Sequence, residues 1–412
     1  MIWGEKMIPR NQIKKNEKPI DIKEGIYERF PVTKQAFVTV SFKDVGEIGY
    51  NHWMNKMMEN MIRRMLGGEE GRRQEDNALD MGANALNLLI GQYGFPNFQF
   101  LKWDPLFVPE GMSKQPVKLP KDVLSSMIKK ASHLYGADLV GITDLDPKWI
   151  YSRDLFKPFK ITEGMKPKET EDAFLIPRKI NKAIVMAVAM DDEMIETSPL
   201  VDASTATSLG YSRMGIAAVS LAEYIRGMGY QAIPCMNDTA ISIPLAVQAG
   251  LGQLGRLGLL ITPEFGPNVR LLKVLTDMPL ENDHPIDFGI PEFCENCHLC
   301  AEHCPSGSIS FEGQNYEGVC ENNNPGVKKW YIYAEKCLRL WQTNGASCAN
   351  CISVCPFTKG FESMQCFECK KCETKTGCEL QVNTHLRAKY GYLQVETWGD
   401  KPRVIRPRRR GL

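Results

Sequence analysis

The placement of the cysteines constrains this chain more than any other feature. All of the fourteen cysteines except Cys235 lie after residue 290. Such clustering favours a metal-bearing segment over disulfides spread through a secreted scaffold. Residues 294–305 read CENCHLCAEHCP, a C-x2-C-x2-C-x3-C run that ends in proline. This spacing is typical of a [4Fe–4S] cube: three close thiolates bind one cube, and the fourth, before the proline, reaches a second cube.

A second, thinner motif supplies part of that second cube. Residues 348–356 read CANCISVCP, in which the first two cysteines give two ligands. The last one, Cys355, precedes a proline and therefore crosses back to the first cube. Two cubes side by side form a relay for single electrons, which explains why one chain carries nearly the same motif twice.

The second cube still lacks one ligand, which must lie upstream of residue 348. We predict Cys337, with Cys320 as its rival. The predicted ligands of the first cube are Cys294, Cys297, Cys300 and Cys355, and those of the second are Cys304, Cys337, Cys348 and Cys351. Structural zinc is the alternative, but zinc sites usually pair two C-x2-C knuckles and need no crossing cysteine.

A further cysteine set follows with the spacing C-x2-C-x2-C-x5-C and without a trailing proline. Its members are Cys366, Cys369, Cys372 and Cys378. They could bind zinc, bind a third cluster, or pair as two disulfides if the protein works outside the cytoplasm. All three interpretations stay open.

Length and charge limit the remaining classes. A chain of 412 residues can bury a large core and divide into two or three domains. Fifty basic and forty-nine acidic residues give a net charge of +1, so nothing indicates a nucleic-acid partner. The longest apolar run, AIVMAVAM, has the length of a buried strand and not of a membrane span. The basic end, RPRRRGL, is interpreted as a solvated tail.

The order of helix and strand patterns predicts the domain organisation. Residues 1–115 form a region that packs on the core, and 52–68 predicts a helix with five methionines on one face. Residues 116–285 form an α/β domain, 286–360 the iron–sulfur domain and 361–412 a cysteine-containing extension. In the α/β domain we predict helices over about 119–135, 204–228 and 241–250, and strands over 137–142, 182–190 and 231–236, with 257–262 and 269–277 as a pair joined by a turn.

Several familiar cofactor motifs are absent from the sequence. There is no G-x-G-x-x-G after a strand, no G-x-x-x-x-G-K-[ST] loop and no H-E-x-x-H. The glycine-rich LGQLGRLG has the wrong spacing for either nucleotide loop. Nearly 300 residues precede the cysteines, so we expect this part of the chain to hold an electron acceptor that none of these motifs binds.

The α/β and cysteine segments together resemble the corrinoid-dependent reductive dehalogenases. The resemblance covers most of residues 119–400 and is carried by LYGADLVGITDLDPKWIYS, TSLGYSRMGIAAVSLAEYIRGMGY, PCMNDTAISIPLAVQAGLGQLGRLGLLITPEFGPNVRLLKVLTDMPL, both cysteine motifs and KYGYLQVETWGD. It implies an α+β or α/β fold, with a nitroreductase-like corrinoid-binding domain followed by a bacterial ferredoxin-like domain holding two [4Fe–4S] clusters. It also implies a cobalamin-type corrinoid and the replacement of halogen by hydrogen on a small organohalide, which we expect to be a chlorinated alkane or alkene.

The resemblance also implies three catalytic residues, which are Tyr211 in LGYSRMG, Asn237 in CMNDTA and Arg270 in GPNVRLL. An ordinary phenol is a poor acid at neutral pH, so Arg270 would stabilise the tyrosinate that remains after Tyr211 gives its proton. Asn237 would donate to the departing halide or orient the phenol. Taken alone, each has a simpler explanation as a packed tyrosine, a surface arginine and a turn asparagine. No motif assigns the corrinoid contacts, which we expect in 233–244 and 251–270.

Partners and location follow from the resemblance alone. It implies a small membrane-anchor protein, an electron donor that is quinone-linked or ferredoxin-type, and a peripheral place on the outer face of the cytoplasmic membrane after twin-arginine export. Without a leader the protein would be cytoplasmic, and homodimerisation stays open. The alternatives are an epoxyqueuosine reductase acting on tRNA, disfavoured by the near-zero net charge, and a non-catalytic iron–sulfur electron carrier.

Overall fold

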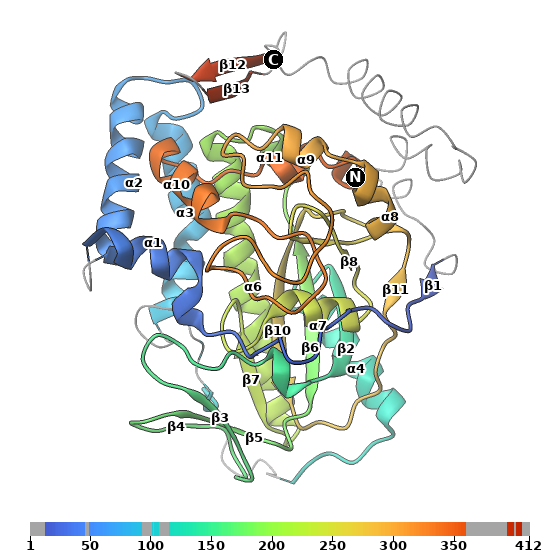
Figure 1. Cartoon of the computed structure of the whole chain (residues 1–412). Helices are drawn as coiled ribbons and strands as arrows, with labels where there is room; N and C mark the ends of the chain where they lie inside the picture. Colours follow the sequence, from blue (N-terminus) through green and yellow to red (C-terminus); the bar gives the residue numbers. More distant parts are fainter. Residues whose placement is uncertain are drawn as a thin grey trace.

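Figure 1 shows the computed structural model of the chain. It describes residues 13–45, 49–92, 101, 103–106, 115–359, 394–398 and 401–405. The third cysteine set (Cys366, Cys369, Cys372 and Cys378) and the basic tail lie outside the described residues.

A four-stranded antiparallel sheet forms the centre of the molecule (Figure 1). Across the sheet its strands are β2 (Leu139–Asp144), β6 (Lys182–Ala189), β10 (Val269–Thr276) and β7 (Ala232–Cys235). Each neighbouring pair is antiparallel. The six inner residues of β6 are all buried, because both faces of the sheet are covered. An antiparallel centre with covering helices makes this an α+β arrangement.

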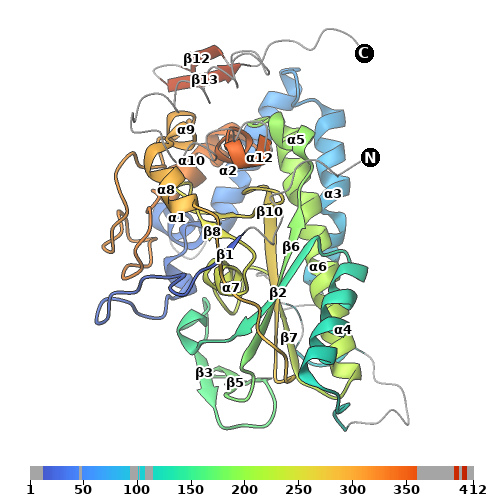
Figure 2. The same cartoon turned by 90° about the vertical axis from the view of Figure 1, so that its right-hand side faces the viewer.

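Alternate residues of β6 point into two separate cores. Ile184, Met186 and Val188 pack against α4 (Lys121–Leu134) and α6 (Val201–Gly227). The residues between them face α7 (Ser242–Gln248) and the small sheet β3-β5-β4. Figure 2 shows α4 and α6 on one side of the sheet and α7 on the other. The small sheet consists of β3 (Phe159–Thr162), β5 (Phe174–Pro177) and β4 (Lys168–Glu169).

One glycine fixes how closely α7 lies on the sheet. A Cβ at Gly141 on β2 would stand 2.2 Å from the backbone oxygen of Ala249, just after α7. Backbone atoms cannot yield by that much, so only glycine permits this approach. The closeness matters because α7 carries part of a cavity wall described below.

Three long helices at the N-terminal end cover the remaining side. They are α1 (Ala36–Val45), α2 (Gly49–Leu66) and α3 (Gln74–Gln92). Helix α3 packs along α6, and α2 packs on α10 of the cysteine domain. The methionine-rich helix is confirmed, but Met58 is 47% exposed, so the five methionines do not share one buried face. These five methionines are spread over more of the helix surface than a single neighbouring element can cover.

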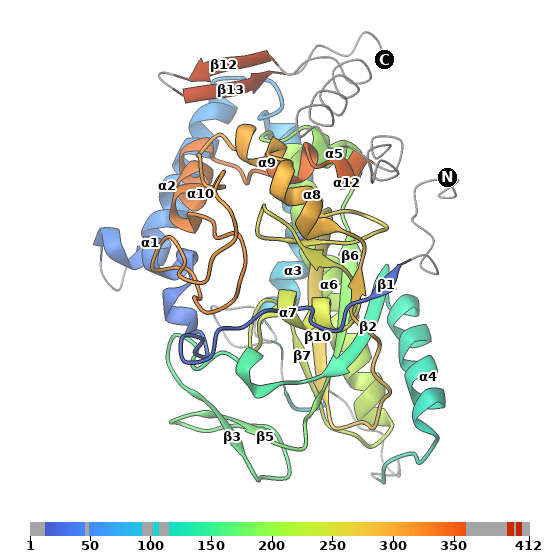
Figure 3. The same cartoon turned by 45° about the vertical axis from the view of Figure 1, so that its right-hand side comes forward.

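The cysteine domain consists of short helices joined by long loops. They are α8 (Ile290–Asn296), α9 (Leu299–Glu302), α10 (Ala334–Asn344), α11 (Asn350–Ser353) and α12 (Pro356–Lys359). Figure 3 shows this group at one end of the central sheet, next to α5 (Asp192–Glu196). The other short strands are β1 (Lys14–Lys15), β8 (Gln253–Leu254), β9 (Leu260–Ile261), β11 (Ile286–Asp287), β12 (Gln394–Trp398) and β13 (Lys401–Ile405).

Most predicted elements of the α/β domain are confirmed, but one strand pairing is wrong. The expected pair of 257–262 with 269–277 does not form. Strand β9 pairs with β8, while β10 pairs with β6 and β7. The run VRLLKVL is long and apolar enough for the centre of the sheet, where two partners cover it. The tight turn closed between Thr262 and Gly266 leaves only a two-residue strand before it.

Candidate functional site

Three side chains from three elements converge at one end of the central sheet. Tyr211 lies on α6, Asn237 follows β7 and Arg270 is the second residue of β10. The antiparallel register of β7 with β10 places the turn after β7 beside the first residues of β10. The Asn237 Nδ2 atom donates to Tyr211 Oη at 2.9 Å. The guanidinium carbon of Arg270 lies 5.1 Å from the centroid of the Tyr211 ring. The structure therefore brings together all three residues named from the sequence.

The position of Arg270 is set by α6. Its Nη2 atom donates to Thr207 Oγ1 at 3.2 Å, one helical turn before Tyr211. A Cβ at Gly210 would come within 3.0 Å of Arg270 Cγ, so the glycine makes room for the arginine beside the helix. The Nε atom of Arg270 is buried and finds no hydrogen-bond partner in the described part of the chain. A cation over the phenol ring, an amide on its hydroxyl and an unused donor form a site suited to negative charge.

A buried lysine holds the turn that presents Asn237. Lys273 on β10 has no exposed surface. Its Nζ atom donates to the carbonyl oxygen of Met236 at 2.6 Å and to Ser242 Oγ at 3.1 Å. The first of these oxygens belongs to the peptide that joins Met236 to Asn237. Lys273 therefore fixes the backbone directly before the asparagine.

A buried carboxylate supports the same turn from its other end. Asp238 accepts hydrogen bonds from the Met236 N–H at 3.0 Å and from the Thr239 hydroxyl at 2.7 Å. Thr239 has a φ of 61°, a left-handed conformation that a free chain would seldom hold. Burial raises the pKa of Asp238 and lowers the pKa of Lys273, while the attraction between the two opposes both shifts. The sequence contains a signal for this pair, because a lysine interrupts the apolar strand VRLLKVL.

The structure gathers the eight predicted cysteine ligands into two adjoining groups. In the first, Cys355 lies close enough to interact electrostatically with Cys294, Cys297 and Cys300. The second contains Cys304, Cys337, Cys348 and Cys351. Cys351 also interacts with Cys300, so the two groups adjoin. This is the division expected if Cys355 crosses to the first motif and Cys304 to the second.

The two remaining described cysteines lie apart from these groups. The Cys320 sulfur is 3.7 Å from the Ile332 carbonyl oxygen and 3.9 Å from Asn322 Oδ1. Cys235 is fully buried at the end of β7, beside Lys273. The arrangement thus favours Cys337 over Cys320 as the upstream ligand.

The donor set of the two groups fits cubic clusters better than single metal ions. Burial, with nearby cysteines adding to it, raises the pKa of Cys297, Cys300 and Cys337 to about 12. Thiolates packed in this way need a positively charged metal centre to compensate them. Within the described ranges, no three Cys, His, Asp or Glu side chains are placed to hold one ion. The crossing of Cys304 and Cys355 between the two motifs is what a pair of cubes requires, because each thiolate of a cube binds a separate iron.

Arg256 joins the glycine-rich loop to the first cysteine motif. Its side chain is 1% exposed, and the guanidinium carbon lies 5.2 Å from the Trp330 ring centroid. Its nitrogens donate to the backbone oxygens of Cys294 at 2.9 Å, Ser310 at 3.0 Å, Glu312 at 2.8 Å and Glu295 at 3.3 Å. The loop LGQLGRLG, which matched no nucleotide motif, therefore places a buried cation beside the first cysteine group.

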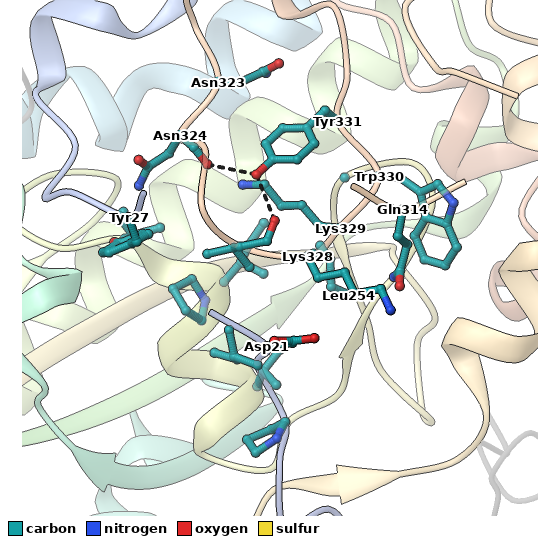
Figure 4. A pocket seen from close by; sticks show the side chains of 18 of the residues that line it. Asp21, Tyr27, Leu254, Gln314, Asn323, Asn324, Lys328, Lys329, Trp330 and Tyr331 are labelled. Carbon is teal, nitrogen blue, oxygen red and sulfur yellow. Dashed lines mark hydrogen bonds between the residues drawn. The ribbon is translucent and has the colours of Figure 1, made fainter. Parts of the chain in front are cut away.

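A cavity of 390 Å³ lies between the α+β core, the N-terminal segment and the loop that joins the two cysteine motifs (Figure 4). Its apolar wall includes Ile241, Ile243 and Val247, and its polar wall includes several amides and lysines. Parts of the two stretches expected to contact a corrinoid, 233–244 and 251–270, line it. The catalytic candidates do not line it, but Thr239, in the Asn237 turn, accepts a backbone hydrogen bond from the lining residue Tyr151 at 3.0 Å.

The lining of this cavity chemically matches part of a corrinoid. That cofactor has a broad apolar macrocycle with amide groups around its edge, and it carries a nucleotide tail. Seven amide residues line the cavity, and several of them, among them Gln253, Asn322 and Asn323, are also hydrogen-bonded within the protein; the remaining lining amides are Asn16, Gln35, Gln314 and Asn324. Amide side chains both donate and accept, so they match the edge of such a ring while the isoleucines match its faces.

Comparisons with known proteins agree with this combination of domains. The family model described as "Reductive dehalogenase subunit" matches residues 137–280, and "4Fe-4S dicluster domain" matches 293–359. The tetrachloroethene reductive dehalogenase of Sulfurospirillum multivorans is 36% identical over 377 residues, 83% of this chain and 75% of that protein. That of Dehalobacter restrictus is 40% identical over 271 residues, 58% of this chain and 49% of that protein. A shorter match, 32% identical over 127 residues, is to an epoxyqueuosine reductase of Listeria monocytogenes.

Solved structures agree on the fold. A reductive dehalogenase described with a mechanism for B12-dependent dehalogenation superimposes with a TM-score of 0.67 at 21% identity. It covers 98% of this chain, while this chain covers 54% of it. The chain thus spans about half of that protein and of the Dehalobacter relative.

No described helix is both long and apolar enough to cross a bilayer.

The fold and the site first define a class: an α+β domain with a dicluster iron–sulfur domain packed against it. The coverage of the Sulfurospirillum relative makes the assignment narrower. The chain belongs to the reductive dehalogenase family. Its 4Fe-4S dicluster domain confirms the iron–sulfur prediction, whereas the nitroreductase-like relationship stays a prediction.

Proposed function

We propose that the chain is the catalytic part of a reductive dehalogenase that acts on a small chlorinated alkene. The reaction consumes two electrons and one proton, forms a carbon–hydrogen bond and releases halide. The observation that carries this proposal is the convergence of Tyr211, Asn237 and Arg270 beside the dicluster domain. The choice of an alkene is supported by the tetrachloroethene named for the relatives.

Each of the three side chains has a distinct task in this proposal. Tyr211 gives the proton from Oη, which Asn237 holds in place through its 2.9 Å hydrogen bond. Arg270 compensates the charge left on the phenol oxygen, because its guanidinium stays protonated at every working pH. The exposed amide of Asn237 is the group available to the departing halide.

The cofactors of this proposal are a cobalamin-type corrinoid and two [4Fe–4S] clusters. A corrinoid would supply the cobalt at which the carbon–halogen bond is broken. We assign the corrinoid to the amide-lined cavity, whose wall continues into the turn that carries Asn237. The clusters would be held by the two cysteine groups, with Cys337 and not Cys320 completing the second. Hydrogen bonds such as that from the Ser308 N–H to Cys304 Sγ, at 3.3 Å, would tune the cluster potentials.

Anaerobic reconstitution tests the proposal directly. The protein is loaded with iron, sulfide and cobalamin, reduced with a viologen, and assayed for halide release from tetrachloroethene and then from chlorinated methanes, ethanes and phenols. We expect release from the chlorinated ethenes, and none from protein that was loaded with clusters alone. Fully loaded protein that releases no halide from any of these compounds would refute the proposal. The same preparation assayed with a tRNA substrate distinguishes the epoxyqueuosine reductase chemistry.

We further propose that the protein works with a small membrane-anchor protein on the outer face of the cytoplasmic membrane. A quinone-linked or ferredoxin-type donor would supply its electrons, and homodimerisation stays open. The resemblance to respiratory family members is the support for this part. Fractionation of cells that produce the native precursor tests the location, and a protein found only in the cytoplasm would contradict it.

A further inference from the structure

Three lysines line the cavity, Lys18, Lys328 and Lys329, and Lys329 is the one that is not exposed to solvent. The Nζ atom of Lys329 lies 4.7 Å from the centroid of the Tyr331 ring. No hydrogen bond or ion pair links that nitrogen to any side chain of the described ranges. Figure 4 shows both residues on the wall of the cavity, next to Asn324. The protein surrounds the lysine on most sides, yet the side chain keeps some accessible surface because it faces the cavity.

A protonated lysine in this position is costly without a counter-ion. Burial alone lowers the pKa of Lys329 to about 8, and no carboxylate opposes this shift. Two other deeply placed cations are well supplied with partners: Lys273 donates to Met236 and Ser242, and Arg256 donates to four backbone oxygens. A buried ammonium without partners destabilises the fold unless something else supplies the opposite charge. The missing partner of Lys329 should therefore be an anion that enters the cavity.

The acidic and polar neighbours of Lys329 do not supply that charge. Asp21 also lines the cavity, but its Oδ2 atom accepts from the Tyr316 hydroxyl at 2.7 Å and does not contribute to the pKa shift of Lys329. The Tyr331 hydroxyl donates to the carbonyl oxygen of Val327 at 2.7 Å. Asn324 brings an amide group to the same wall, whereas the Asn323 amide is used in hydrogen bonds to Val319, Cys320 and Ile332. One ammonium with nearby amides matches an anion of charge −1 that can accept several hydrogen bonds.

We infer that this wall binds the phosphodiester of the corrinoid's nucleotide tail, with Lys329 as its counter-ion. The inference rests on the proposed function, because it assumes that a corrinoid occupies the cavity. A phosphodiester carries one negative charge at every working pH and has two free oxygens for hydrogen bonds. The apolar wall formed by Ile241, Ile243 and Val247 lies in the same cavity and would accommodate the uncharged part of the cofactor.

Corrinoids with and without the tail test the inference. Cobalamin contains the phosphodiester and its nucleotide, whereas cobinamide lacks the nucleotide. Both are titrated into protein that carries its clusters but no corrinoid, and binding is measured by equilibrium dialysis and by the visible spectrum. We expect the wild type to prefer cobalamin by about 10- to 100-fold, as for a desolvated charge-assisted contact. Lys329→Gln should reduce the preference to about threefold or less, with its affinity for cobinamide retained.

A matched control exists in the same part of the chain. Lys23 also stacks on a tyrosine, with Nζ at 5.6 Å from the Tyr316 ring centroid, but it does not line the cavity. Lys23→Gln removes the same charge and should leave the preference unchanged. Lys329→Met serves as a second neutral replacement if the glutamine variant loses its fold, which would appear as the loss of both corrinoids and of iron.

The outcomes separate this inference from the proposed function. If the wild type binds both corrinoids equally, or if Lys329→Gln and Lys329→Met keep the full preference for cobalamin, the tail is not bound by Lys329. The corrinoid assignment would survive that result. If the wild type with intact clusters binds neither corrinoid, the proposed function fails, and this inference fails with it.

Discussion

The buried Lys273 should be essential for stability as well as for the geometry of the site. The change Lys273→Met keeps the length of the side chain and removes its charge. It deletes the hydrogen bonds to the Met236 oxygen and Ser242 Oγ, and it removes the cation that faces Asp238. The turn that presents Asn237 then loses its support, so we expect halide release to fall together with stability.

The magnitude follows from the burial of Lys273 and of the oxygen that it binds. Lys273 is 0% exposed, and its charge is close enough to Asp238 to oppose the rise in the pKa of that carboxyl group. Loss of this buried donor leaves the Met236 oxygen unsatisfied, which typically costs about 1–3 kcal/mol, and it also removes a nearby compensating charge from Asp238. The exposed pair Lys129–Asp283 is the matched control. Its side chains are 36% and 31% exposed, so Lys129→Met should cost about 1 kcal/mol or less.

Equilibrium urea unfolding, followed by tryptophan fluorescence, measures these differences in the free energy of unfolding. The double variant Lys273→Met/Asp238→Asn should recover part of the loss, because it removes the uncompensated charge while the amide oxygen still accepts from Met236. In the single variant, acidification should restore some stability, since burial already raises the pKa of Asp238 and protonation removes its charge. The reasoning would be refuted if Lys273→Met cost no more than Lys129→Met.

Three further predictions concern the clusters, the proton donor and the cavity. Cys337→Ser should reduce the iron content from about eight per chain to about four or fewer, whereas Cys320→Ser should leave it unchanged; equal iron in both would exclude Cys337 as a ligand. Tyr211→Phe should keep iron and corrinoid content but reduce turnover by about 100-fold or more, and unchanged turnover would remove Tyr211 from the mechanism. Lys329→Gln should stabilise corrinoid-free protein at pH 7 by at most about 3 kcal/mol. Between pH 8 and 10 the lysine is protonated in the unfolded protein but not in the folded one, so the stability of the wild type rises with pH. The stability advantage of the variant, measured by urea unfolding, should therefore vanish by about pH 10.5. An advantage that does not depend on pH would contradict the reasoning.

Local patterns in the sequence predicted most of the helices and strands, but they could not predict the order of the strands in the central sheet. The apolar runs of β6 and β10 and the helices α4, α6 and α7 could all be recognised from periodicity and from glycine or proline at their ends. The pairing of β10 with β6 and β7 could not be recognised, because it joins segments separated by helices and depends on which faces are finally covered. Neighbouring strands in the sequence were the natural guess and were wrong for β9.

The candidate site was likewise predicted only in part from the sequence. The cysteine spacing predicted the division into two groups, because cysteines only three residues apart have few ways to bind a cluster. Tyr211, Asn237 and Arg270 were named only through the family resemblance, because a lone tyrosine, asparagine or arginine has no spacing to recognise. The supporting charges Lys273 and Arg256 were missed. Each was visible as a cation inside an apolar or glycine-rich run, but only the structure shows that their partners are backbone oxygens.

Helix α6 connects the second cysteine group to Tyr211, the proposed proton donor. Near its start, Ser204 Oγ lies 2.8 Å from Ser347 Oγ, the residue directly before the ligand candidate Cys348. One turn later Thr207 holds Arg270, and one further turn brings Tyr211. Seven residues at 1.5 Å each place the cysteine domain contact and the phenol about 10 Å apart along one rigid helix. A single helix thus sets the distance between the second cysteine group and the Tyr211 phenol, from which the proposed chemistry takes its electrons and its proton. The helix is held in place because it packs against the sheet on one side and against α3 on the other.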